Sequence, residues 1–201
     1  MKKFTSIFAF VLTIAVCITA FSACDVGLKR KEPTADSYFN FTLLDDDTYM
    51  IAAKDLNDLP AMVVLPSEHE GKAVTTIADS AFEESKIERI FIPESYTKIG
   101  AYAFVRCSLL KTVEFSVKKN IKTIDTGAFS YCASLKGIEF SSSLEVIGAR
   151  AFIGCTSLSS VYVTANVREI GEKAFDDCTC TIDVSENNKY YKSENNQIVA
   201  K

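Results

Sequence analysis

The chain has 201 residues, with 26 acidic and 22 basic side chains and a formal net charge of −4. Loss of an N-terminal export signal that contains two lysines would leave a mature chain with a net charge of about −6. Nucleic-acid binding requires a basic stripe that displaces counterions from phosphates, so this composition argues against a nucleic-acid partner.

Residues 1–23 have the features of an export signal. Two lysines give a positive start, Phe4 to Ala20 is almost wholly apolar, and small residues precede a cysteine. Phe21-Ser-Ala-Cys24 resembles the lipobox of bacterial lipoproteins, in which the cysteine is diacylated and becomes the mature N-terminus. The resemblance implies lipidation at Cys24 and a protein anchored to the membrane in the cell envelope or at the cell surface. Simple secretion and an uncleaved membrane anchor are the alternatives.

Residues 24–37 predict a tether between the lipid anchor and a folded domain. The segment is polar and contains Pro33, which is typical of flexible linkers. It also contains the basic run Lys29-Arg30-Lys31, for which two interpretations stay open: contact with anionic lipid headgroups, or a solvated place in the tether.

Residues 38–72 are interpreted as an N-terminal cap. Two β-prone runs, Tyr38 to Leu44 and Thr48 to Ala53, flank Asp45-Asp-Asp47 and predict a β-hairpin. Asp accepts the left-handed backbone of such a turn, and the ligand spacing of a calcium loop is missing, so the acidic cluster indicates a turn. A further short strand is predicted at residues 62–66. A repeat array needs a cap because its first coil would otherwise expose core.

Five copies of a phrase that ends in Ala-Phe place five coils in residues 73–185. Their phenylalanines are spaced by 22, 25, 23 and 23 residues and are Phe82, Phe104, Phe129, Phe152 and Phe175. A period in this range is typical of a solenoid, in which each repeat buries its apolar face against its neighbours. The third residue after each phenylalanine is a serine in the first copy and a cysteine in the others: Ser85, Cys107, Cys132, Cys155 and Cys178.

Each coil also contains an alternating triplet with apolar outer residues. The triplets are Ile90-Phe-Ile92, Val113-Glu-Phe115, Ile138-Glu-Phe140, Val161-Tyr-Val163 and Ile182-Asp-Val184. Alternation with period two predicts a strand whose outer residues face the core and whose middle residue faces solvent. The stacked coils therefore predict a parallel sheet with one strand per coil of about 23 residues, joined by short helical or irregular turns. Residues 186–201 are interpreted as a C-terminal tail or partial cap.

These columns resemble the BspA-type leucine-rich repeats of bacterial cell-surface proteins. The clearest copy runs from Ile147 to Val163, and the resemblance covers about residues 38–201. It implies a β-rich leucine-rich-repeat solenoid, and a role in adhesion or in the binding of host or matrix proteins.

The five cysteines of the repeat region invite a disulfide interpretation in an exported protein. Neighbouring coils place the Cα atoms of the cysteine column about 4.8 Å apart, which a disulfide permits. Parallel side chains in a ladder meet poorly at the required dihedral angle, so buried thiols are favoured, and disulfides stay open. Cys180 lies outside the column and is the candidate for an exposed thiol. A line of thiols does not converge as zinc ligands must, so no metal site is predicted.

The sequence offers no basis for an enzyme. Its only histidine, His69, lies in the turn-like stretch from Pro66 to Gly71, and no hydrolase, zinc-protease or phosphate-loop motif occurs. Scattered carboxylates give no reason to select a catalytic pair. We expect no catalytic residue and no cofactor, and we interpret His69 as a surface residue of a turn.

The candidate binding surface is the solvent-facing side of the triplet strands. Its members are the middle residues of the triplets and one residue of the neighbouring column: Phe91, Glu114, Glu139, Tyr162, Asp183 and Arg89. Exposed aromatic side chains beside charges are typical of protein-binding surfaces. An ordinary solvated sheet face is the alternative.

These features favour a surface-tethered binding or adhesion protein whose repeat sheet contacts a host, matrix or mucin protein, or a glycan. The alternative is a structural or assembly component of the bacterial cell envelope that binds a partner of its own cell. Neither function involves nucleic acid.

Overall fold

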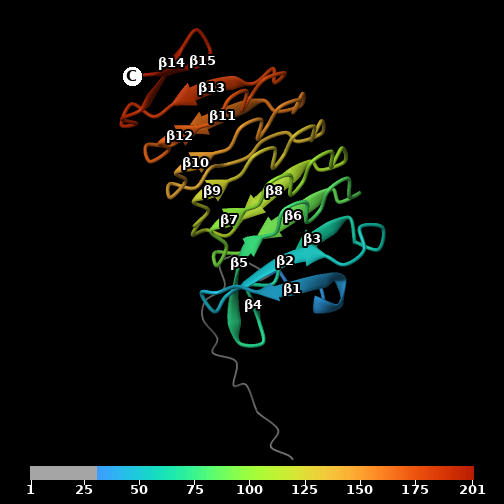
Figure 1. Cartoon of the computed structure of the whole chain (residues 1–201). Helices are drawn as coiled ribbons and strands as arrows, with labels where there is room; N and C mark the ends of the chain where they lie inside the picture. Colours follow the sequence, from blue (N-terminus) through green and yellow to red (C-terminus); the bar gives the residue numbers. More distant parts are fainter. Residues whose placement is uncertain (1–30) are drawn as a thin grey trace, which may run out of the picture. The chain divides into compact units, whose positions relative to one another are not determined.

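The computed structural model describes residues 31–201 (Figure 1). The predicted export signal, the lipidation site Cys24 and the first part of the predicted tether lie outside the described residues. Coils follow one another in chain order from β1 to the hairpin of β14 and β15, as Figure 1 shows. The solenoid of stacked coils with little helix is confirmed, because the described residues contain one short 3-10 helix, η1 (Asp36–Tyr38), among many strands.

Four of the five alternating triplets lie in strands of the first of two parallel ladders. A three-stranded sheet contains β3 (Met62–Val64), β6 (Arg89–Ile92) and β8 (Thr112–Phe115), and a two-stranded sheet contains β11 (Ser160–Val163) and β13 (Thr181–Val184). Most outer triplet residues are buried, as Ile90 at 1% exposure and Val163 at 0% illustrate, and the others are half-buried: Phe115, Phe140, Ile182 and Val184. The predicted strand at residues 62–66 is present as β3, and it pairs in parallel with β6.

A second parallel ladder accompanies the one that was predicted. Its repeat strands are two residues long and end at the isoleucine of each phrase: β7 (Lys98–Ile99), β9 (Thr123–Ile124), β10 (Val146–Ile147) and β12 (Glu169–Ile170). In β7, β9 and β10 the isoleucine is buried and the residue before it is half-buried. Two residues are too short for a recognisable alternation, which is why the pattern predicted one strand per coil.

The phenylalanines of the Ala-Phe phrases form a stacked column inside the solenoid. Adjacent ring centroids, from Phe82 to Phe175, lie 5.0–5.3 Å apart with interplanar angles of 3–10°. The four rings before Phe175 are fully buried. This separation is close to the strand spacing of about 4.8 Å, so each ring packs against the ring of the next coil.

The cysteine column consists of free thiols. Each thiol donates a hydrogen bond to the carbonyl oxygen of the phenylalanine one coil earlier, as in Cys107 to Phe82 at 2.9 Å and Cys155 to Phe129 at 3.1 Å. Cys180 is only 2% exposed, so its expected exposure is wrong. Its backbone carbonyl accepts a hydrogen bond from the Asn196 side chain at 3.0 Å, which fixes this residue beneath the C-terminal hairpin.

An antiparallel hairpin precedes the first coil. It consists of β1 (Phe39–Leu43) and β2 (Tyr49–Ala53), and Asp47 has a φ of 65° in the predicted acidic turn. β2 pairs in parallel with β5 (Lys72–Ile77), and β4 (Glu68–His69) pairs with β5 in the antiparallel direction. The hairpin is therefore confirmed, and its capping role stays a prediction.

A second antiparallel hairpin, β14 (Tyr191–Glu194) and β15 (Gln197–Ala200), follows the last coil. The backbone N–H of Ile170 donates to the Tyr191 hydroxyl at 3.0 Å, and that of Ile182 donates to the Asn196 side-chain oxygen at 2.7 Å. These side chains satisfy backbone groups that would pair with a further coil. Residues 186–201 thus end in a hairpin whose side chains accept hydrogen bonds from the last strand of each ladder, β12 and β13.

Candidate binding surface on the repeat sheet

The structure places the predicted binding residues on the solvent side of the triplet ladder. Phe91 and Glu114 are register partners on β6 and β8, and Tyr162 and Asp183 are register partners on β11 and β13. Arg89 opens β6 opposite Thr112. These residues face outward, as the alternation predicted. The structure brings them together in two groups, one with Arg89, Phe91 and Glu114 and one with Tyr162 and Asp183.

An interruption of the ladder separates the two groups. In residues 31–201, the segment 137–140, which contains Glu139, forms no strand with β8 or β11. The turn between Phe115 and Ile121 is two residues longer than the equivalent turn between Ile92 and Tyr96. This longer turn adjoins the interruption, where residues of both coils line a hollow of about 530 Å³.

Glu114 lies at the centre of a charged cluster. The Arg89 guanidinium is 2.6 Å from one carboxylate oxygen, and the Lys31 ammonium pairs with the other. Lys31 also lies over the ring of Phe91, 4.8 Å from the ring centroid, in a cation–π contact. The hydrogen bonds from Lys31 and then Arg89 hold the pKa of the Glu114 carboxyl below its usual value.

Residues 31–36, which we call the N-terminal strap, contact the domain at further points. The Thr34 N–H donates to the Val64 carbonyl at 2.8 Å, and the Val64 N–H donates to the Thr34 hydroxyl at 2.9 Å. The Asp36 carboxylate lies 2.8 Å from Nδ1 of His69. The described end of the predicted tether is thus held against β3 and β4, and Lys31 contacts Glu114 and Phe91.

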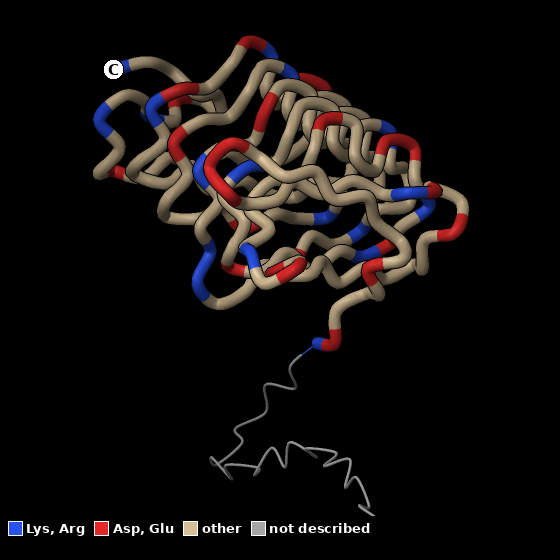
Figure 2. Tube along the Cα trace, turned by 60° about the horizontal axis from the view of Figure 1, so that its bottom comes forward, with Lys and Arg blue, Asp and Glu red and all other residues tan. Residues whose placement is uncertain are grey.

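Two of the acidic residues of the candidate surface, Glu114 and Glu139, are paired with basic side chains. Lys119 forms an ion pair with Glu139, and this contact lowers the pKa of the Glu139 carboxyl. Figure 2 shows charges of both signs distributed along the coils. In the part of the chain that the structure describes, Asp183 has no ion-pair partner, and its neighbour Tyr162 is 57% exposed.

Two contributors to this surface were not predicted. Lys119 belongs to the longer turn. In the sequence, the only sign of this turn was the 25-residue spacing from Phe104 to Phe129. Lys31 lies in a polar segment without periodicity, so no pattern connects it with a glutamate 83 positions away.

His69 is more enclosed than the expected surface turn residue. Its ring stacks on Phe41 at a centroid separation of 3.6 Å, and the edge of Tyr49 lies 5.0 Å away. Its side chain is 22% exposed because these rings and Asp36 surround it. Between residues 31 and 201, no three histidine, cysteine or carboxylate side chains are grouped as metal ligands would be.

No helix within residues 31–201 combines the length and apolar character that crossing a bilayer requires.

Comparison with known proteins gives a consistent result. Residues 67–193 match the BspA type leucine rich repeat region in six copies. This match extends beyond the predicted repeats at 73–185 on both sides, so it includes a unit without an Ala-Phe phrase. No curated protein matches the chain.

Several solved structures are similar to this chain. A leucine-rich repeat protein of T. pallidum is 35% identical, with a TM-score of 0.68 over 73% of this chain and 68% of that protein. A leucine-rich repeat protein of Bacteroides ovatus is 27% identical, with a TM-score of 0.60 over 79% of this chain and 41% of that protein. The pneumococcal vaccine antigen PcpA shares the fold at 20% identity, with a TM-score of 0.61 over 81% of this chain and 52% of that protein.

The repeat match covers more than half of the chain, the described coils carry the expected buried columns, and the similar structures are bacterial leucine-rich repeat proteins. The chain belongs to the BspA-type leucine-rich repeat family.

Proposed function

We propose that this chain is a surface-tethered binding protein whose triplet sheet contacts a host, matrix or mucin protein, or a glycan. Its family generally consists of protein-binding or adhesion-like scaffolds that are typically found at the cell surface, and its fold is typical of non-enzymatic proteins. The finer proposal adds lipidation at Cys24, which would hold the solenoid at the membrane through its N-terminal segment.

The exposed pair Tyr162 and Asp183 carries the proposal. Tyr162 is 57% exposed on an ordered strand, and Asp183 is its register partner on β13. A tyrosine held on a rigid sheet supplies contact area with little loss of conformational entropy on binding. The equivalent position on β6, Phe91, already has the Lys31 ammonium over its ring, so the C-terminal part of the face is the more accessible part.

A binding panel tests this proposal. The mature chain is immobilised, and matrix proteins and mucin are passed over it. Tyr162→Ala should weaken binding by about tenfold, since exposed aromatic anchors dominate such interfaces. Tyr131→Ala is the matched control, because Tyr131 is 50% exposed but belongs to an Ala-Phe turn. Binding that is equal in wild type and Tyr162→Ala would remove the face from consideration.

Two further measurements separate the parts of the proposal. Cross-linking in live cells that returns only envelope proteins of the same cell would favour the assembly alternative. Cys24→Ser should release the protein from membranes, and a variant that still sediments with membranes would contradict the lipid anchor while leaving the binding face open.

A further inference from the structure

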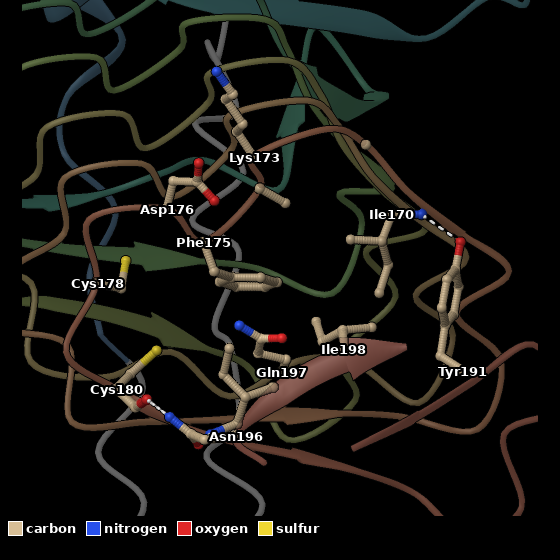
Figure 3. A pocket seen from close by; sticks show the side chains of 13 residues that line it. Ile170, Lys173, Phe175, Asp176, Cys178, Cys180, Tyr191, Asn196, Gln197 and Ile198 are labelled. Carbon is tan, nitrogen blue, oxygen red and sulfur yellow. Dashed lines mark hydrogen bonds between the residues drawn. The ribbon is translucent and has the colours of Figure 1, made fainter. Parts of the chain in front are cut away.

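A cavity of about 420 Å³ lies between the last coil and the C-terminal hairpin. Phe175 and Ile170 line it from the coil, and Gln197 and Ile198 line it from β15 (Figure 3). Ile182 of the last coil also lines it. Phe175, Ile170 and Ile182 are half-buried, although their equivalents in the middle of the solenoid are buried. The interior of the solenoid is therefore accessible at this end.

The cavity begins where the phenylalanine column ends. Within the described residues, the Phe175 ring stacks only on the ring of Phe152, at a centroid separation of 5.3 Å and an angle of 3°. Every earlier pair in the column has nearly the same separation, 5.0–5.3 Å. One more ring at that separation would fall beyond Phe175, on the side where the hairpin leaves the cavity.

We propose that this cavity binds a small aromatic ligand whose ring stacks on the face of Phe175 that is turned away from Phe152. Ile170, Ile182 and Ile198 supply apolar lining to a site whose exposed surface is mostly polar, and its volume lies in the range of about 300–1,000 Å³ that is typical of small-molecule sites. Offset stacking is one of the two arrangements that aromatic rings prefer, and Phe175 already stacks in parallel on Phe152.

Polar side chains line the same cavity and suit a ligand that carries a polar substituent. Lys173 and Asp176 are contributed by the last coil, and Gln197 by the hairpin, as Figure 3 shows. Asn196 is already committed, since it bonds the Ile182 N–H at 2.7 Å and the Cys180 carbonyl at 3.0 Å. These bonds hold the hairpin in place while the cavity beside it stays open. The site is separate from the triplet face, so it is tested independently of the proposed function.

The absence of tryptophan from the sequence makes the test direct, because no protein indole contributes to the emission when the probe is excited at wavelengths that tyrosine does not absorb. N-acetyl-tryptophanamide is titrated with the full mature chain, and N-acetyl-leucinamide serves as an apolar competitor without a ring. We expect saturable binding with a blue shift of the indole emission, and displacement by the leucine compound only at concentrations about tenfold higher.

Two variants locate the site. Phe175→Leu removes the stacking surface but keeps an apolar side chain, and Ile198→Phe fills the cavity with a ring of the chain itself. Each should weaken N-acetyl-tryptophanamide binding by about tenfold. Val199→Phe is the matched control, because Val199 follows Ile198 on the same strand and points to the opposite face. Thermal melts monitor folding, and Ile198→Phe carries the test if Phe175→Leu does not fold.

Several outcomes would overturn the proposal. They are no saturable binding by the wild type, equal competition by N-acetyl-leucinamide, or unchanged affinity in Ile198→Phe. A peptide such as acetyl-Gly-Trp-Gly-amide that binds about tenfold more tightly than the free amide would replace the small ligand with the aromatic side chain of a peptide. Saturable binding that is lost in Ile198→Phe and kept in Val199→Phe supports it.

Discussion

The thiol of Cys132 donates a hydrogen bond to the carbonyl oxygen of Phe104, 3.0 Å away and one coil earlier in the chain. Both side chains are completely buried. The two signature residues of the repeat are thus linked across the coil boundary, one through its side chain and the other through its backbone. The cysteine column acts as a series of weak hydrogen-bond donors to the phenylalanine carbonyls of the preceding coils.

These thiols make unfolding pH-dependent in alkaline solution. Burial raises the pKa of the Cys107 thiol from 9.0 to about 11, and it also raises the pKa of Cys132. The unfolded chain loses these protons first, so stability is complete below pH 9 and falls between about pH 9 and 11. Urea denaturation across this range should give a slope of up to about 1.4 kcal/mol per pH unit for each thiol.

Cys107→Ser is the control for this slope. The serine removes one titrating thiol, and the first coil already has Ser85 at the same position of the column, 3% exposed. The pH dependence should become shallower in the variant. An identical slope in variant and wild type would show that the buried thiols do not titrate as expected.

The stacked phenylalanines should differ in their contribution to stability according to their place in the column. The Phe129 ring lies between the rings of Phe104 and Phe152, with centroid separations of 5.0 Å and 5.3 Å. Phe129→Ala leaves a cavity between these two rings and should lower the free energy of unfolding by about 3–5 kcal/mol. Phe175→Ala removes a half-buried ring with one stacked neighbour and should cost clearly less. Urea denaturation of both variants measures the difference, and equal losses would contradict the end effect.

Much of the fold could be predicted from the sequence because large apolar residues recur at the same positions of each repeat. The Ala-Phe phrases and the triplets correctly indicated which side chains face the core, as the burial of Phe129 and Ile90 shows. The second ladder escaped prediction because a strand such as Lys98–Ile99 is too short to show alternation. Its pairing depends on the stacking of neighbouring coils rather than on local propensity.

The candidate surface could be predicted only in part. Period two identified Tyr162 and Asp183 as outward neighbours, and the structure places them in register. The partners that neutralise Glu114 and Glu139 could not be inferred, because Lys31 and Lys119 lie outside the repeating columns. The repeated residues predict the scaffold, whereas residues outside the repeat, such as Lys31 and Lys119, decide which charges on the candidate surface are paired.

The N-terminal strap should loosen when Lys31 is replaced. Lys31→Ala removes the ion pair to Glu114 and the cation–π contact to Phe91, so the Thr34 bonds to Val64 should open more often. We expect hydrogen exchange at the Val64 amide to become about two- to fivefold faster, in keeping with the modest free energy of exposed pairs.

Lys119→Ala is the matched control for the strap. It removes the ion pair between Lys119 and Glu139, and Glu139 lies in the coil after that of Glu114 and, within residues 31–201, forms no ion pair with the strap. Acid should have the same effect as Lys31→Ala. The pKa of Glu114 is lowered from 4.5, so the contact is complete above pH 4.5 and is lost as the pH falls through the lowered value. Exchange at Val64 that is equally slow in Lys31→Ala and wild type would mean that Lys31 does not hold the strap.

Two glycines should respond in opposite ways to the same substitution. Gly148 follows the isoleucine of its phrase, and a Cβ there would lie 2.4 Å from the backbone nitrogen of Thr126 in the preceding coil. Gly137 lies at the interruption of the triplet ladder, and a Cβ there would meet nothing within 4 Å. Gly148→Ala should therefore cost at least about 1–3 kcal/mol, because neighbouring backbones must separate. Gly137→Ala should be neutral or stabilise by about 0.4–1 kcal/mol, because it restricts the unfolded chain. Thermal unfolding of both variants measures the contrast, and a tolerated alanine at position 148 would contradict the close approach of the coils.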